Sequence, residues 1–456
     1  MKIILLNGSP KGDRSVTMQY ARYIMKKFPE HEYHIENIAA GIKKIGREPE
    51  VFQEIVRSVA GADAVIWAFP LYYLLVPSQY KRFIELIHER DAGAAFRGKY
   101  AAVLTTSIHF FDQTAHQYMH AVCDDLGMRF GGSFSAEMSD LLRETERRRL
   151  ESFARLFFRA AEERAPVQRI YAPLVWPQLA YIPGPVTAPV TAGQKKILIL
   201  TDSDNPESNL GRMIERIRGT FSGSVELIRL QDPDIRGGCL GCIQCGYDNT
   251  CIYTDGYRAF FEEKILPADI IILAGTVTDR YLSSAWKQFF DRSFFRGHIP
   301  SVEGKQLGFV IAGPLRQIQP LRETLSAWAE NGKANARFVT DEATDSGELD
   351  ALLDRFAAEL VRCADEQYIP PPTFYSTGGH KIFRDAIWGR MRIAFQADYR
   401  YYRENGEFDF PQKEYGIRLF NALIVPFTRF TGFRKKVIGD IRNRMVQPFE
   451  KILTDA

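Results

Sequence analysis

Short apolar runs alternate with segments of helical periodicity along most of this 456-residue chain. The first run, Ile3 to Leu6, predicts a buried strand. It ends in the turn signal Asn7-Gly8-Ser9-Pro10, and apolar residues then recur at helical spacing from Met18 to Phe28. A strand, a loop and a helix in this order form an anion site, because backbone N–H groups and the positive end of the helix dipole converge there.

The same alternation continues and then repeats. It predicts ten strands in two sets of five, separated by helical segments. The first set is Ile3–Leu6, Glu32–Ile38, Ala64–Ala68, Tyr100–Thr105 and a run beginning at Phe130; the second is Lys196–Leu200, Val225–Leu230, Asp269–Ala274, Leu307–Ala312 and Ala336–Val339. Alternating strands and helices favour parallel α/β sheets. The chain is therefore predicted to be a tandem repeat of one doubly wound five-stranded fold.

Proline-rich stretches indicate where the two repeated domains begin and end. Residues 166–194 are rich in proline and lack helical periodicity, so they are predicted to be an ordered connector between domains 1–165 and 195–370. The segment 371–456 follows a Pro-Pro-Pro break and is predicted to be a helical extension rich in basic and aromatic residues, with a helix around Trp388 to Tyr402.

The first loop has the residues that a phosphate needs. Ser9, Ser15 and Thr17 can donate hydroxyl hydrogen bonds, and Lys11 and Arg14 add positive charge. The pattern Asn-Gly-Ser-Pro-Lys followed by Ser-x-Thr resembles the FMN-phosphate loop of the flavodoxin-like NAD(P)H-dependent FMN reductases. The resemblance implies two tandem flavodoxin-like domains and an FMN phosphate held by Ser9, Lys11, Ser15, Val16 and Thr17. The alternative is a turn that binds nothing.

Two further loops of the first domain follow strands that should end at the same sheet edge. Pro70-Leu71-Tyr72-Tyr73 resembles the family's loop along the flavin ring, and Thr106 and Ser107 are placed to hydrogen-bond that ring. Tyr72 and His109 are the candidate catalytic side chains. His116 and His120 are one helical turn apart, but they are predicted to be surface or substrate-facing histidines rather than metal ligands.

The matching loop of the second domain differs. Asp202, Asp204 and Glu207 replace the basic residues, and Thr276-Val-Thr-Asp-Arg280 stands where the Pro-Leu-Tyr loop would be. A carboxylate close to a phosphate dianion costs on the order of 1 kcal/mol even when well solvated. A flavin site in this domain is therefore predicted to be degenerate.

Four of the six cysteines, Cys239, Cys242, Cys245 and Cys251, lie within thirteen residues of the second domain. The spacing C-x2-C-x2-C-x5-C allows four thiolates to surround one point, as ferredoxin-like loops do. It resembles the compact motif of iron–sulfur flavoproteins and implies a [4Fe–4S] cluster. Plain thiols and a zinc site are the alternatives. The other two cysteines, Cys123 and Cys363, are predicted to be buried thiols.

Hydrophobic and charged contents of 45% and 25% are typical of globular proteins, and a net charge of +3 argues against a nucleic-acid partner. No signal segment or membrane-spanning run is evident, so a cytoplasmic location is expected. The last forty residues mix apolar and basic residues. They are interpreted as a helical arm that packs on the domains or on a second copy, with a membrane-surface or partner-binding tail as the alternative.

Together these patterns predict an FMN-dependent oxidoreductase. It would take hydride from NAD(P)H and pass electrons to a small-molecule or protein acceptor, by way of the cysteine cluster if one forms. The competing hypotheses are a non-enzymatic electron carrier or redox sensor, and a scaffold without flavin. A homodimer is a candidate assembly, although the two domains of one chain could pair with each other in its place.

Overall fold

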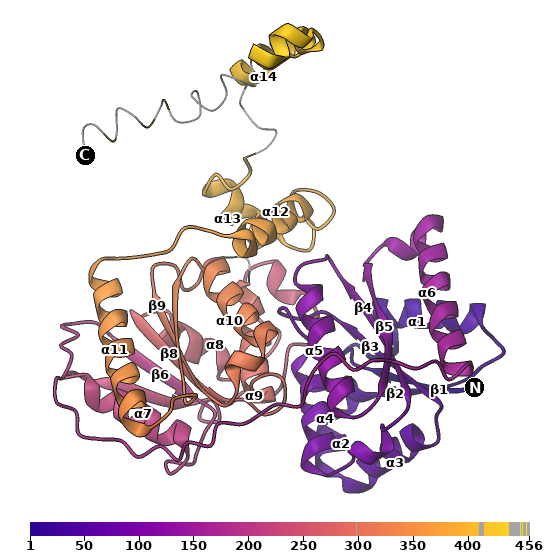
Figure 1. Ribbon diagram of the computed structural model, residues 1–456, viewed down its shortest axis with the longest axis horizontal. Coiled ribbons are helices and arrows are strands. Elements are labelled where there is room, and N and C mark those ends of the chain that lie inside the picture. The colour runs from indigo at the N-terminus through magenta and orange to yellow at the C-terminus, as the bar shows by residue number, and fades with distance from the viewer. Residues whose placement is uncertain (298, 410–414, 437–446, 448, 450–452, 454–456) are drawn as a thin grey trace. The chain divides into compact units, whose positions relative to one another are not determined.

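The computed structural model describes residues 1–297, 299–409, 415–436, 447, 449 and 453. Residues Met1–Tyr399 form one compact unit, and Arg400–Ala456 form another (Figure 1). Both predicted sheets lie in the first unit. No helix among the described residues is long and apolar enough to cross a membrane.

The first sheet has the strand order β2-β1-β3-β4-β5, and all neighbouring strands are parallel. Its strands are β1 (Lys2–Asn7), β2 (Glu32–Asn37), β3 (Ala64–Pro70), β4 (Tyr100–Ser107) and β5 (Arg129–Glu137). The helices are α1 (Val16–Lys27), α2 (Ile38–Arg47), α3 (Pro49–Ala60), α4 (Ser78–Glu89), α5 (Asp112–Asp125) and α6 (Glu144–Glu162), with 3-10 turns at Gly12–Arg14, Gly93–Ala95 and Asp140–Leu142. The five predicted strands and the flavodoxin-like order are confirmed.

Alternating side chains of this sheet fill two cores. Ile3 and Leu5 pack with residues of α1 and α6 on one face, whereas Ile4 and Leu6 pack with residues of α3, α4 and α5 on the other. Because β1, β3 and β4 are covered on both faces, they are almost continuous apolar runs, as central parallel strands require.

The second sheet has the order β10-β9-β8-β6-β7, which is the same order read from its other edge. Its strands are β6 (Ile197–Thr201), β7 (Val225–Arg229), β8 (Ile270–Thr276), β9 (Gln306–Ala312) and β10 (Asn335–Thr340). The helices are α7 (Asn209–Thr220), α8 (Tyr257–Phe260) continued by a π-turn (Phe261–Ile265), α9 (Ser284–Arg292), α10 (Gln319–Asn331) and α11 (Ser346–Asp365), with 3-10 turns at Gln244–Gly246, Ser293–Arg296 and Leu315–Gln317. The predicted tandem repeat is confirmed.

The two sheets share a continuous apolar core across the helices α4 and α9. The backbone N–H of Ser78, at the start of α4, donates to Asp291 of α9 over 2.7 Å. In the mirror arrangement, the N–H and hydroxyl of Ser284, at the start of α9, donate to Glu85 of α4. Each helix is therefore capped by a carboxylate from the other, and an approximate two-fold axis relates the domains.

Two buried lysines follow the same symmetry. Lys81 pairs with Glu85 over 2.9 Å and with Asp279 over 3.0 Å. Lys287 pairs with Asp291 and also donates to the carbonyl oxygen of Tyr72 over 2.9 Å. Both lysines are fully buried. The contact of Lys81 with Asp279 and that of Lys287 with Tyr72 cross from one domain to the other, so each lysine links the two domains.

Two predictions about helices need correction. After β2 the pattern predicts a single helix over Glu48–Val59, but α2 precedes α3, and its Ile38 and Ile45 are buried. The aromatic helix expected around Trp388 to Tyr402 is broken: α12 (Phe374–Trp388) ends at a bend, and α13 (Gln396–Glu404) begins after it. The second compact unit also contains α14 (Tyr415–Ile424) and a 3-10 turn at Val425–Arg429.

Candidate functional site

The first loop, which the sequence predicts to be an anion site, is ordered by hydrogen bonds of its own. The side chain of Asn7 accepts a hydrogen bond from the N–H of Ser9 over 3.0 Å, and the hydroxyl of Ser9 accepts one from Lys11 over 3.3 Å. Gly8 is required at the turn, because a Cβ there would lie 2.7 Å from the ring of Tyr80. These contacts fix the loop between β1 and α1.

The N-terminus of α1 keeps donors for a phosphate. Ser15 caps the helix by accepting from the N–H of Met18 over 3.2 Å. The N–H groups of Val16 and Thr17 have no intrahelical acceptor, since they are the first two of the helix, and no other acceptor takes them within the described part of the chain. Two such donors at the positive end of a helix dipole suit a phosphate monoester.

The two other predicted loops meet this helix. The hydroxyls of Thr17 and Thr106 lie 2.6 Å apart, and the N–H of Leu71 donates to the carbonyl oxygen of Thr106 over 3.1 Å. Tyr73 and Leu74 form a tight turn with φ of 40° and 67°. The structure therefore brings together the phosphate loop, Pro70–Tyr73, and Thr106 with Ser107 at the carboxyl edge of the sheet.

The cysteine loop of the second domain lies directly against this edge, a contact that no local pattern predicts. The side-chain amide of Gln79 donates to the carbonyl oxygen of Cys239 over 3.0 Å. A Cβ on Gly241 would lie 1.7 Å from the hydroxyl oxygen of Tyr72 and 3.4 Å from the Lys11 side chain. Gly241 also has φ of +61°, so glycine is needed there for both space and backbone conformation.

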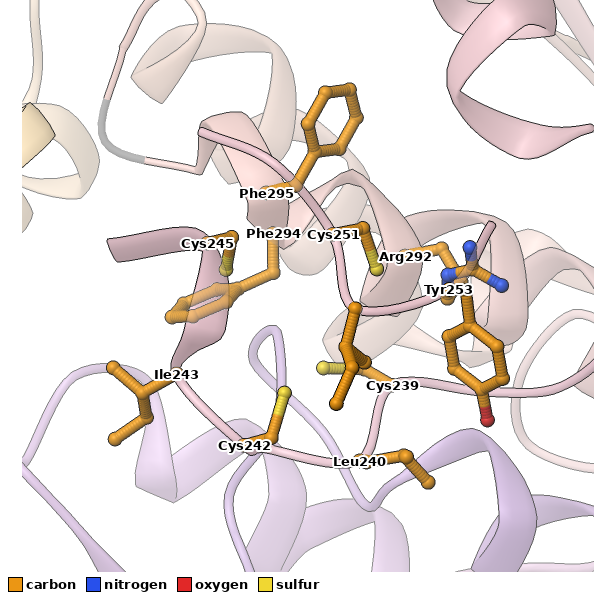
Figure 2. Close-up of a pocket in the computed structure, with 11 residues that line it drawn as sticks. Cys239, Leu240, Cys242, Ile243, Cys245, Cys251, Tyr253, Arg292, Phe294 and Phe295 are labelled. Carbon is orange, nitrogen blue, oxygen red and sulfur yellow. The ribbon is translucent and has the colours of Figure 1, made fainter. Parts of the chain in front are cut away.

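The four cysteines surround one pocket. Their thiols point toward the space between them (Figure 2). The residues Phe294 and Phe295 also line this pocket, although the ring of Phe295 points away from the thiols. Cys239 and Cys245 are partly buried, whereas Cys242 is exposed. Within the described ranges, no group of three or more His, Cys, Asp or Glu side chains is arranged to hold a single metal ion.

Burial controls the charge of two of these thiols. Desolvation is the largest effect on Cys239 and Cys245, and it raises the pKa of each to about 12. The N–H of Gly241 donates to the Cys239 sulfur over 3.4 Å and partly offsets this effect. Without a bound cation the two thiols are therefore neutral near pH 7, and binding one would release their protons.

Tyr72 and His109, the two candidate catalytic residues, have different surroundings. Burial, followed by the nearby Cys239, raises the pKa of Tyr72 well above its ordinary value, so the phenol stays neutral. His109 is exposed, and its Nδ1 lies 3.0 Å from a carboxylate oxygen of Asp112. The backbone of His109 donates to the hydroxyl of Ser107 over 2.9 Å.

His116 and His120, predicted to be surface or substrate-facing histidines, are half-buried. His116 Nε2 lies 2.8 Å from the hydroxyl of Thr105, and burial lowers the pKa of His116. His120 stacks on Phe130 with ring centroids 3.9 Å apart. Both side chains are therefore part of the packing between α5 and the sheet.

The loop after β6 keeps the backbone geometry of the first loop. Ser203 N–H donates to Thr201, as Ser9 N–H does to Asn7, and Ser208 caps α7 as Ser15 caps α1. The connector lies against this helix terminus: the Asn209 side chain accepts from the N–H of Tyr181 over 3.0 Å and donates to the carbonyl oxygen of Leu179 over 2.7 Å. The side chain at the position that matches Val16 is thus hydrogen-bonded to the backbone of the connector.

The start of the C-terminal extension contacts the loop after β4 of the first domain. Phe110 contacts Phe383 of α12 with ring centroids 5.3 Å apart, and Phe111 contacts Tyr375 at 5.4 Å. Further along, a Cβ on Gly246 would lie 2.0 Å from the carbonyl oxygen of Ala394. Residues 374–394 therefore contact both the loop after β4 and the cysteine loop.

The family model described as NADPH-dependent FMN reductase matches residues 1–138 and 195–345, which is more than half of the chain. The chain belongs to the NADPH-dependent FMN reductase family. Both domains of this family member are matched, in agreement with the repeated strand order. The family's enzymes use FMN and a reduced nicotinamide.

Solved structures with a similar fold cover about one domain of the chain. An NADH:FMN oxidoreductase in its apo form is 20% identical, with a TM-score of 0.30, and the match covers 34% of this chain and 87% of that one. The flavoenzyme FerB, an NAD(P)H:(acceptor) oxidoreductase from Paracoccus denitrificans, is 19% identical with a TM-score of 0.28 (36% and 97% covered). An FMN-dependent NADH-azoreductase from Bacillus anthracis is 17% identical with a TM-score of 0.27 (36% and 99% covered). Among curated proteins, none matches this chain.

Proposed function

We propose that this family member binds one FMN on its first domain and oxidises NAD(P)H for an external electron acceptor. The observation that carries the proposal is the link from Thr17 through Thr106 to Leu71, because it joins a phosphate site to two loops suited to a flavin ring. In this proposal Ser9, Lys11, Ser15, Val16 and Thr17 hold the phosphate, and Pro70, Leu71, Tyr72, Tyr73, Thr106 and Ser107 frame the ring. FMN supplies the hydride and electron chemistry when bound.

The second domain is proposed to bind no flavin of its own. The side chain of Asn209, the first residue of α7, is already hydrogen-bonded to the connector. The carboxylates of Asp202, Asp204 and Glu207 would also repel a phosphate dianion. This domain retains the fold and contributes the cysteine loop.

We further propose that Cys239, Cys242, Cys245 and Cys251 hold a [4Fe–4S] cluster. The support is that all four thiols line one pocket next to the ring loop of the first domain. Four thiolates are the usual ligands of such a cluster. Zinc and free thiols are the alternative states of this loop.

The chain's own groups would place and shield the reactants. Tyr72 keeps a neutral phenol between the ring loop and the cysteine loop, so it can donate a hydrogen bond. His109 and Asp112 form an exposed polar pair beside Ser107, where an incoming substrate could be positioned. We propose these two side chains for testing as catalytic residues.

The first experiment is a visible spectrum of anoxically purified protein, with iron, sulfide and flavin assays on the same sample. One flavin per chain with about four irons would support the whole proposal. One flavin without iron or zinc would leave an FMN reductase with free thiols. A reducible flavin without steady-state NADH or NADPH oxidation would favour an electron carrier or redox sensor.

The phosphate site has a matched control within the chain. Ser15 and Ser208 cap equivalent helices, and replacing either with alanine should cost about 1 kcal/mol of stability. Only Ser15→Ala should weaken FMN binding, by about tenfold for one lost charge-assisted hydrogen bond. Titrating the flavin-free protein with FMN and with riboflavin tests this, since riboflavin binding should not change. Equal effects of the two substitutions on FMN affinity would contradict the assignment to the first domain.

A further inference from the structure

The segment 415–436 of the second compact unit has a composition unlike the rest of the chain. It carries five basic residues, Arg418, Arg429, Arg434, Lys435 and Lys436, and no acidic residue. Charges of both signs are nearly balanced over the whole chain, with 59 basic and 56 acidic residues. The segment therefore carries a local net charge of +5.

The same segment exposes large apolar side chains. None of the residues of α14 is buried, and Leu419, Phe420 and Leu423 are 64%, 58% and 61% exposed. Leu419, Phe420, Leu423 and Ile424 recur at i, i+1, i+4 and i+5, so they share one face of the helix. Arg418 lies on the opposite face. The 3-10 turn continues the apolar side with Val425 and Phe427, which are 59% and 54% exposed.

Several partners fit this segment poorly. A second copy of the same segment would bring five positive charges against five, with no carboxylate to pair them. A nucleic acid would satisfy the charges but leave the apolar face in water. A bilayer span is excluded by length, because α14 has ten residues and a span needs about twenty.

An anionic lipid surface satisfies both features. An amphipathic helix lies in the interface with its apolar side in the acyl boundary, and basic residues beside it contact anionic headgroups. The basic cluster Arg434 to Lys436 follows the apolar stretch directly, so both would meet the interface together. We infer that residues 415–436 bind the surface of an anionic membrane and hold this reductase there. The inference does not depend on which cofactors the domains bind.

The test is co-sedimentation of the full-length protein with vesicles of phosphatidylcholine alone or of an equal mixture with phosphatidylglycerol. Binding to the mixed vesicles at about 0.1 M salt, and its loss on phosphatidylcholine alone or at about 1 M salt, is the expected result. Equal binding to both vesicle types, or no binding to either, would overturn the inference.

Two variants separate the apolar and the electrostatic contributions. Phe420→Glu combined with Leu423→Glu should abolish binding, and Arg434→Gln, Lys435→Gln and Lys436→Gln together should weaken it by about a hundredfold. The controls change exposed residues of the first domain: Leu142→Glu, and Arg148→Gln with Arg149→Gln and Arg159→Gln. Controls that weaken binding as much as the tail variants would show that another surface is responsible. Thermal unfolding of every variant checks that the fold is intact.

Discussion

Single glycines determine how closely the two domains approach each other at the site. Gly241 has φ of +61° and lies over Tyr72, so alanine there would meet both backbone strain and a side-chain collision. Gly193 has nearly the same backbone, with φ of +63°, but a Cβ on it would meet nothing within 4 Å. Comparing alanine substitutions at Gly193 and Gly241 therefore separates the cost of backbone strain from the cost of the collision with Tyr72.

We predict that Gly193→Ala costs about 1–2 kcal/mol of unfolding free energy, the ordinary cost of a left-handed residue with a side chain. Gly241→Ala should cost more and should also move the cysteine loop away from Tyr72. Alkylation of Cys239 in metal-free protein reports that movement, and it should be faster only in Gly241→Ala. Equal alkylation rates in the two variants would show that the loop does not depend on this contact.

At the scale of elements, the helices α4 and α9 stabilise the domain interface, because each is capped by a carboxylate of the other. Glu85→Gln removes a carboxylate that pairs with the buried Lys81 and caps α9. Lys81 keeps Asp279 as a partner, so we expect a loss of about 2–3 kcal/mol rather than the full cost of an orphaned buried charge. The control is Glu89→Gln on the same helix, where an exposed pair with Arg82 should contribute under about 1 kcal/mol.

The same residue predicts a pH dependence. Burial alone would raise the pKa of Glu85, but Lys81 and the hydrogen bonds from Ser284 outweigh it, and the folded pKa lies below the ordinary value of 4.5. A depressed folded pKa contributes stability above the unfolded pKa and loses it as pH falls through the folded pKa. The difference in unfolding free energy between the wild type and Glu85→Gln should therefore shrink as pH falls below about 4.5. Chemical unfolding at several pH values measures it, and a constant difference would contradict the pairing.

The elements that sequence predicted well are those with a local signal. Central parallel strands such as β3 and β8 are continuous apolar runs, and the order of strand, loop and helix from Ile3 to Phe28 follows a contiguous pattern. The helix α2 was missed because Gly41 and Gly46 lower its intrinsic helicity, by about 1 kcal/mol each relative to alanine. It forms because its apolar side packs on α4.

Contacts between distant parts of the chain had no such signal. Gly241 stands at an unspecified position of the cysteine motif, and the contacts of Gln79 and Gly241 arise only when the two domains pair. The occupation of the second domain's helix terminus by Leu179 and Tyr181 is of the same kind. The break after Trp388 was missed because aromatic and basic residues continue through it without a proline.

For the whole molecule, the pairing within one chain predicts its assembly state. The face that α4 and α9 would offer to a second copy is already buried between the two domains. We therefore expect a monomer by size-exclusion chromatography with light scattering in the absence of lipid. A measured mass of twice that of one chain at low concentration would show that a further interface exists. It would contradict the idea that the two domains of one chain replace the two subunits of a dimer.

The approximate two-fold axis also has a genetic consequence. In a symmetric homodimer every substitution appears twice, so a carboxylate that disfavours phosphate in one site disfavours it in both. Joining two copies in one reading frame removes that constraint, and each copy can then accumulate its own changes. Asp202, Asp204 and Glu207 on one half and the intact loop of the other are differences of this kind, and they would have been costly before the copies were linked.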